Sequence, residues 1–199
     1  MTISITTCNL VLGELRAAPI VDIAEDSIEA RECARYYPQC LRILLERHDW
    51  AFANRRATLA ELATNDRAAE WGHAYVLPAD CATPLRLVAT DGCAPDFIVE
   101  NRTLYTSLGD AVLEYAVNDV TDSEMTGLFV DALAYALAAR LAVPIRDSRE
   151  IKGQMLQQAE IAFQRAVAEN RNRQPERDAV GPDAVALVRL GAALGRWVR

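Results

Sequence analysis

The feature that most constrains the fold is the stretch 122–172, in which apolar residues recur at helical spacing on both sides of one proline. Thr121 and Glu124 have the spacing of a capping box, so they predict the start of a long helix. Pro144 lacks an amide hydrogen and clashes with the preceding turn, so this helix should end near Val143. Its apolar stripe consists of Leu128, Phe129, Ala132, Leu133, Ala136 and Leu137.

A second helix is predicted after this proline, with Asp147 as its N-cap and Glu150 at the matching third position. Its two faces differ in polarity, which is typical of a helix packed on one side. A pair of such helices cannot bury its stripes alone and needs partner helices. The apolar face carries Ile151, Met155, Ala159, Ala162, Phe163, Ala166 and Val167, and the other face carries Lys152, Gln154, Gln157, Glu160, Gln164 and Arg165.

The first part of the chain predicts these partner helices. Apolar residues on one edge indicate a helix over about 3–16, and Ser27 with Ala30 after it indicates the start of another. Pro38 lies inside this second pattern, where it should kink or split the helix. A short helical piece with Leu59 and Leu62 facing inward is expected around 57–63.

Between 71 and 117 the pattern changes from helical spacing to short β-prone runs. Turn residues separate these runs, among them Pro78, Pro84, Asn101-Arg102 and Gly109-Asp110. Strands of this length and spacing predict a small antiparallel sheet inserted between the helices. The runs are 75–77, 85–89, 97–99, 104–106 and 112–117.

The predicted fold class is therefore α+β and mainly α: an antiparallel helical bundle with an inserted small antiparallel β lobe and a C-terminal tail. We expect the bundle in residues 1–70 and 119–172, the β lobe in 71–118, and a linker with a docking tail in 173–199. A polar run precedes an apolar last segment, which should dock on its own core or on a neighbour.

Composition bounds the class of partner. The formal net charge of −7 disfavours a general nucleic-acid binder, which needs clustered cations. Neither a secretory leader nor an apolar run of bilayer length is visible, so we expect no membrane anchor. The five cysteines form no CxxC pair, which argues against a disulfide framework.

Candidate chemistry is sparse. Cys81 beside Asp80, with His73 upstream, is the one conceivable nucleophilic constellation, but no glycine elbow or helix-entry signal would activate the thiol. A structural loop cysteine is the simpler interpretation, and His48 fits a hydrogen-bonded residue at a helix end. Ligand spacing for a metal and phosphate-binding glycine loops are missing. We therefore expect no catalytic residue, cofactor or metal, and a binding or building protein.

Five short motifs in a fixed order resemble one family. The chain is similar to the tail tubular protein A family, the head-to-tail adaptor, or connector, of short-tailed phages and related prophages. The resemblance covers about residues 5–172, and His73 stands where the family usually has a tyrosine. The motifs are Cys8-Asn9-Leu10 with Gly13-Glu14-Leu15, Trp50-Ala51-Phe52-Ala53-x-Arg55-x-x-x-Leu59, Trp71-Gly72-His73-Ala74-Tyr75-x-x-Pro78-x-Asp80-Cys81, Leu113-Glu114-Tyr115, and Phe129-x-x-Ala132-Leu133-x-x-x-Leu137-Ala138.

The resemblance implies a structural virion protein. Members of this family form a dodecameric ring beneath the portal protein and above the tail nozzle, and DNA passes through the ring lumen without sequence-specific binding. It implies a location at the head–tail junction of the virion, and in the host cytoplasm during assembly. A ring requires a heterologous interface between copies.

Particular residues receive roles from these considerations. Trp50, Phe52, Trp71 and Tyr75 are expected to pack in the core where the bundle meets the β lobe. Related adaptors suggest a C-terminal arm that reaches the portal, so portal or inter-subunit contacts are expected at Leu190, Leu194, Trp197 and Val198. Two alternatives stay open: a cytosolic cysteine hydrolase using Cys81 and His73, and a helical regulator that docks partner proteins through its last segment.

Overall fold

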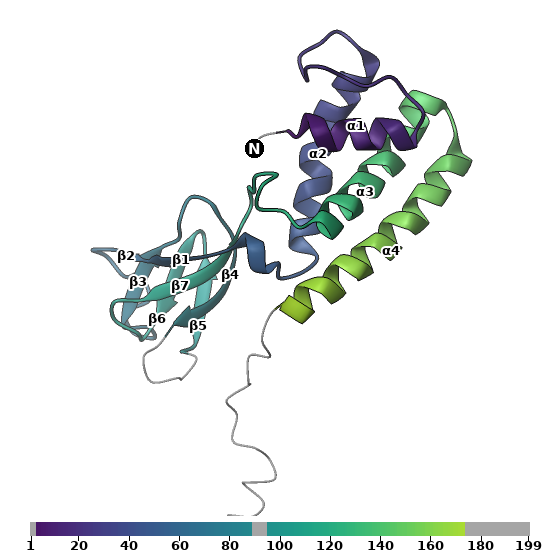
Figure 1. Ribbon diagram of the computed structural model, residues 1–199. Helices are drawn as coiled ribbons and strands as arrows, with labels where there is room; N and C mark the ends of the chain where they lie inside the picture. The colour runs from purple at the N-terminus through teal and green to yellow at the C-terminus, as the bar shows by residue number, and fades with distance from the viewer. Residues whose placement is uncertain (1–2, 89–94, 174–199) are drawn as a thin grey trace, which may run out of the picture.

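The computed structural model describes residues 3–88 and 95–173 of the chain. Figure 1 shows two parts side by side, a helical part and a smaller β part. The fold is mixed α+β and mainly α, as expected. In the described residues the helical part has four helices: α1 (Ile5–Glu14), α2 (Ile28–Glu46), α3 (Gly127–Arg146) and α4 (Arg149–Arg173).

The centre of the helical part is α3, which packs against the other three helices. It forms an antiparallel pair with α4 along its whole length (Figure 1). The expected stripe of α4 is confirmed, since Ala162, Phe163, Ala166 and Val167 are buried. Because α3 packs against three neighbouring helices, residues on more than one of its faces are buried. These residues are Phe129, Ala132, Leu133, Ala134, Leu137, Ala138, Ala139, Leu141 and Ala142.

The expectation that no stretch reaches bilayer length needs a correction, because α3 is long and apolar enough to cross a membrane by length and composition. The core helix of a soluble protein passes the same test. Half of the qualifying stretch is buried against the rest of the protein. The apolar character of α3 is accounted for by its central place among α1, α2 and α4.

Helix ends differ from the predicted ones around residues 121–126. The predicted contact forms, because the backbone N–H of Thr121 donates to Glu124 (2.8 Å), but it closes a turn ahead of the helix. Thr126 is the N-cap of α3, and its hydroxyl accepts from the N–H of Phe129 (3.3 Å). The prediction was wrong because two threonines compete for the cap, and Thr126 is the one next to the buried stripe.

The predictions about two prolines need correction. Pro38 does not split α2, which continues through it as one helix, and α3 continues through Pro144 to Arg146 instead of ending near Val143. Packing of these helices offsets the missing hydrogen bond. Asp147 consequently lies in the left-handed region (φ 47°) as the C-cap of α3. The N-cap position of α4 falls to Ser148, whose hydroxyl accepts from the N–H of Ile151 (3.2 Å).

The β part contains two small antiparallel sheets rather than the one expected. One has the strand order β1-β7-β4 and the other β2-β3-β6-β5. Asn101 and Arg102 both have positive φ, as the two-residue hairpin between β5 and β6 requires. The five predicted strand positions are confirmed. The strands are β1 (Asn54–Thr58), β2 (Ala60–Glu61), β3 (His73–Val76), β4 (Cys81–Val88), β5 (Phe97–Glu100), β6 (Thr103–Thr106) and β7 (Val112–Val117).

The expected helical piece at 57–63 is wrong, since β1 and β2 occupy this stretch. Leu59 is buried as predicted, but its N–H donates to the carbonyl of Ala111 (2.9 Å) beside the strand pair β1–β7. Strands thus begin at Asn54, inside the range assigned to the bundle. Pairing with a distant strand overrides the local helical spacing of two leucines.

The three-stranded sheet is held by a buried carboxylate. Glu114 of β7 is 2% exposed and lies opposite Arg56 of β1 and Arg86 of β4 in the strand register. Its Oε2 accepts from Arg56 Nε (3.0 Å) and Arg86 Nη2 (2.9 Å). Two cations therefore compensate the one buried charge and link all three strands.

Candidate functional site

The two parts of the fold meet at Trp50, which follows α2 and is 1% exposed. Its indole Nε1 donates to the carbonyl of Leu44 (2.8 Å), so its one polar atom is paired. Phe129 of α3 and Phe163 of α4 lie edge-on to the indole, with ring centroids 4.8 and 6.0 Å away. Phe52 of η1 (Ala51–Ala53) completes the cluster. Trp50 thus joins three helices to the segment that enters β1, as the core interpretation predicted.

Asn170 near the end of α4 fixes the same segment by hydrogen bonds. The residue is 4% exposed, and its Oδ1 accepts from the N–H of Ala51 (3.0 Å). Its Nδ2 donates to the carbonyl of Asp49 (3.0 Å) and lies 3.1 Å from His48 Nε2. One amide therefore satisfies backbone groups on the turn between α2 and η1. We call Trp50, its ring cluster and Asn170 the joint.

The surface of the joint carries a paired cation. Arg47 stacks on the ring of Phe163 (3.8 Å to the centroid) and donates from Nη2 to Glu160 (2.9 Å). His48 lies beside it, and burial, followed by the nearby Arg171, lowers the pKa of this histidine. The expected hydrogen-bonded histidine at a helix end is confirmed.

The lowered pKa of His48 predicts a pH dependence of stability. The unfolded chain takes up a proton on this histidine as the pH falls through about 6.5, whereas the lowered pKa of His48 in the folded protein shifts its protonation to a lower pH. Stability from this residue is present above that pH and is lost below it, by at most about 1.4 kcal/mol per pH unit. Urea unfolding between about pH 7.5 and 5.5 should show this slope, and His48→Gln should reduce it. An unchanged slope in the variant would contradict this assignment.

A cleft lies between the helical part and the β part. It has a volume of about 510 Å³ and is open to solvent. Aliphatic, amide and charged side chains line it together, which suits a protein segment better than a reacting small molecule. Its lining residues are Arg42, Leu45 and Glu46 of α2, Ala82 and Thr83 of β4, and Ala116, Val117, Asn118 and Asp119 at the end of β7.

A second groove, of about 640 Å³, crosses α2, the end of α3 and the start of α4. We call it the cationic groove because four of its lining residues are basic, in a chain of net charge −7. Glu32 is its one acidic lining residue, and Tyr36, Val143 and Pro144 give it an apolar floor and rim. The four cations are Arg35, Arg140, Arg149 and Lys152.

The structure does not bring Cys81 and His73 together as a catalytic pair. Cys81 belongs to β4 of the three-stranded sheet, and His73 belongs to β3 of the other sheet. His73 Nδ1 lies 2.7 Å from Glu61 Oε1, and its ring stacks on Tyr75. Cys81 is 6% exposed, and burial raises the pKa of its thiol. A buried thiol with little thiolate character is a poor nucleophile.

Thiol labelling checks this placement of Cys81. Cys93 lies outside the described residues, so the experiment uses a Cys93→Ser variant. Its remaining thiols, on Cys8, Cys33, Cys40 and Cys81, are free and buried, and we expect them to react with a maleimide at the rate of unfolding. Fast stoichiometric labelling of Cys81 in the native protein would restore the hydrolase interpretation.

Other chemistry finds little support in the described residues. Within 3–88 and 95–173, His, Cys, Asp and Glu side chains form no group of three or more that could hold a metal ion. The expected contacts at Leu190, Leu194, Trp197 and Val198, with the whole stretch 174–199, lie outside the described residues.

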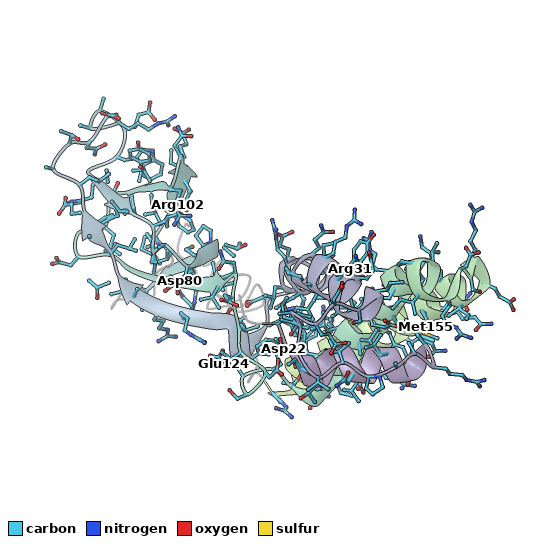
Figure 2. All side chains as sticks on the ribbon, turned by 90° about the horizontal axis from the view of Figure 1, so that it is seen from above. Asp22, Arg31, Asp80, Arg102, Glu124 and Met155 are labelled. Carbon is cyan, nitrogen blue, oxygen red and sulfur yellow. The ribbon has the colours of Figure 1, made fainter. Side chains whose placement is uncertain are left out.

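Two of the five sequence motifs contribute residues to the joint. Trp50, Phe52 and Phe129 form its ring cluster, and Arg55 pairs with Glu124 where the chain returns to α3. Figure 2 shows Glu124 between the two parts, with Asp80 in the β part. Tyr115 donates from its hydroxyl to Asp80 Oδ1 (3.2 Å) across β4 and β7.

Sequence reasoning missed Asn170 and the cationic groove. A signal existed for each. Asn170 continues the buried stripe of α4 at helical spacing after Ala166 and Val167, so a polar residue fell on an apolar face. Arg149 and Lys152 place two cations in the first turn of α4, where the helix dipole favours acids.

Comparison of the chain with protein-family models found no match, and comparison with curated proteins found no relative.

Proposed function

We propose that this chain is a structural virion protein, the head-to-tail adaptor that joins portal to tail. In this proposal its fold is an antiparallel helical bundle with an inserted β lobe and a C-terminal tail, and it is not an enzyme. Copies assemble as a ring, a dodecamer by the family resemblance, with the portal protein above and the tail nozzle below. The ring forms part of the DNA conduit at the head–tail junction.

One observation carries the proposal: Trp50 and Phe129, which belong to two motifs far apart in the chain, meet in the joint. Together with Asn170 they hold the segment that leads into β1 against the helices, through rings and backbone hydrogen bonds. A subunit of a ring that transmits load needs its parts held in one relative orientation, because a loose joint would spoil the closure of the ring.

Exposed apolar side chains supply surfaces for assembly. They lie on different elements of the subunit, and a heterologous interface uses two different surfaces. Leu156 and Ile161 are exposed on α4, and Val76 and Val99 are exposed on the β lobe. Leu10, Val21 and Ile28 are exposed on α1, the connector after it and the start of α2.

The charge of the chain suits the conduit role. A net charge of −7 repels the phosphate backbone, so DNA can slide past the ring without binding to it. The apolar tail 174–199, with Leu190, Leu194, Trp197 and Val198, is proposed to contact the portal or a neighbouring copy. The protein has no proposed cofactor and acts in the virion, after assembly in the host cytoplasm.

Co-expression with the portal protein encoded in the same genome tests the proposal. We expect the portal to retain the full-length chain through affinity purification and size exclusion, and electron microscopy to show a ring beneath the portal. A matched variant truncated after Arg173 should fold but bind the portal less tightly. If the full-length chain never binds a portal or forms a ring, the proposal is wrong.

A further inference from the structure

We propose that the cationic groove of one copy receives the acidic turn of a second copy, residues 20–27 between α1 and α2. This inference deepens the proposed function, because it names the contact through which neighbouring copies would meet in the ring. It rests on that function for its setting, but its chemistry stands on the described residues alone.

The cations of the groove have no carboxylate partner among the described residues, and Arg35 only lies over the ring of Tyr36 (5.4 Å to the centroid). Arg35, Arg140, Arg149 and Lys152 are exposed, and within residues 3–88 and 95–173 none of the four forms a salt bridge. Lys152 is the only lysine in the chain. Arg149 and Lys152 weaken rather than support the start of α4, since the helix dipole disfavours cations there. Their gathering in one groove therefore points to an anionic partner.

The acidic turn is ordered before it meets any partner. Asn9 of α1 holds Ile20 by two hydrogen bonds. Asn9 Nδ2 donates to the carbonyl of Ile20 (2.9 Å), and the N–H of Ile20 donates to Asn9 Oδ1 (2.8 Å). Glu25 Oε2 accepts from the N–H of Val21 (3.0 Å), and Asp22 Oδ1 accepts from the N–H of Ala24 (2.9 Å). A turn fixed in this way loses little entropy on binding.

The turn presents the groups that complement the groove. Val21 is 87% exposed, the most of the exposed large hydrophobic residues in the described chain. Asp22 and Asp26 follow it in the turn as exposed carboxylates. The valine matches the apolar side of the groove at Val143 and Pro144, and the carboxylates match its four cations. Such a contact would have an apolar centre and a charged rim, as protein–protein interfaces commonly do.

A second copy fits these observations better than nucleic acid does. The groove is local, with Glu32 in its lining, whereas phosphate tracking needs an extended basic stripe. The net charge of −7 would repel a long polyanion from the rest of the surface. A second copy carries the same net charge, but it brings its carboxylates to the groove at a single turn rather than along an extended phosphate backbone.

Groove and turn consist of different residues of the subunit. The turn is anchored to α1 through Asn9 and ends at Ser27, the N-cap of α2, and the groove lies on α2, α3 and α4 from Glu32 onward. In Figure 2 Asp22 lies toward α1, while Arg31, one helical turn before Arg35, lies over α2. The contact is therefore heterologous, so successive copies build a closed ring or an open chain.

Charge reversal of each surface tests the contact with the full-length protein. The groove variant is Arg140→Glu with Lys152→Glu, and the turn variant is Asp22→Lys with Asp26→Lys. Both pairs are exposed, and thermal unfolding should confirm that each variant folds. Sedimentation at low ionic strength then measures association. We expect wild-type chains to self-associate, with an association constant that falls as the salt concentration rises. The association constant of each variant alone should be lower than that of the wild type by about tenfold or more.

Mixing the two variants gives the sharper result. Each keeps one intact surface, so the mixture should form a one-to-one dimer that cannot grow. Wild-type chains that stay monomeric up to their solubility limit would overturn the inference. Unchanged association of the groove variant, a mixture that fails to pair, or DNA binding that the groove variant loses would also overturn it. If both charge-reversal variants still form a ring on the portal, the contact is refuted and the adaptor function stands. If the protein self-associates through the groove but does not bind the portal, the contact stands and the adaptor function is refuted.

Discussion

Replacing Trp50 with alanine is expected to lower the free energy of unfolding by about 3–5 kcal/mol. The indole is fully buried and touches rings from α3, α4 and η1, so truncation opens a cavity where the two parts of the fold meet. It also leaves the carbonyl of Leu44 without its indole donor. Chemical denaturation followed by circular dichroism measures the change.

Two variants control for this effect. Trp50→Phe keeps most of the ring contacts but removes the indole N–H, so it should recover more than half of the lost stability. Trp71→Ala removes the same side chain from a half-buried position in the β part and should cost much less. A Trp50→Ala variant within about 1 kcal/mol of the wild type would show that the joint contributes little to the fold.

Replacing Asn170 with alanine is expected to cost about 2–4 kcal/mol. The change leaves the N–H of Ala51 and the carbonyl of Asp49 unpaired in a buried setting. The substitution should lower the global free energy of unfolding and also destabilise this segment locally, because the unpaired groups lie on the turn that leads into the β part. Hydrogen exchange at the amide of Ala51 should therefore accelerate beyond the change predicted from global stability.

Asn170→Asp is the diagnostic variant for this clamp. A carboxylate can still accept from Ala51 but cannot donate to the carbonyl of Asp49, so it should be nearly as destabilising as alanine at neutral pH. Gln158→Ala removes an exposed amide from the same helix and serves as the matched control. Equal losses in Gln158→Ala and Asn170→Ala would contradict the clamp.

Much of the fold could be predicted from local pattern, because burial and periodicity coincide there. The stripe of α4 and the N-cap at Ser27 agree with the structure. The hairpin turn at Asn101-Arg102 agrees as well: asparagine favours the positive φ that the turn needs, and Arg102 adopts it too. In each case the deciding interaction lies within a few residues along the chain.

The predictions of secondary structure were wrong where contacts between residues far apart in the chain determine the local structure. Leu59 and Leu62 have a helical spacing, but β1 before Leu59 pairs with β7, more than fifty residues away, and β2 before Leu62 pairs with β3, so this stretch is extended. Pro144 stays inside α3 because packing against α4 continues past it. Local rules about proline and helical spacing carry no information on these partners.

The joint could be predicted only in part. Trp50 and Phe52 were expected in the core from their size and context, whereas Asn170 acts through three atoms brought together by the tertiary fold. The cationic groove likewise combines three helices, so no single stretch of sequence contains it. Charges far apart in the chain reveal a common surface only after folding.

The most direct test of the adaptor proposal is the mass of the assembly that the full-length chain forms on its portal. Native mass spectrometry of the purified complex counts the copies of each chain. The account predicts one closed ring of this protein on each portal, with twelve copies by the family resemblance, and a single mass for the complex. A chain that remains a monomer in the presence of portal, or binds it in variable numbers without closure, would contradict the account.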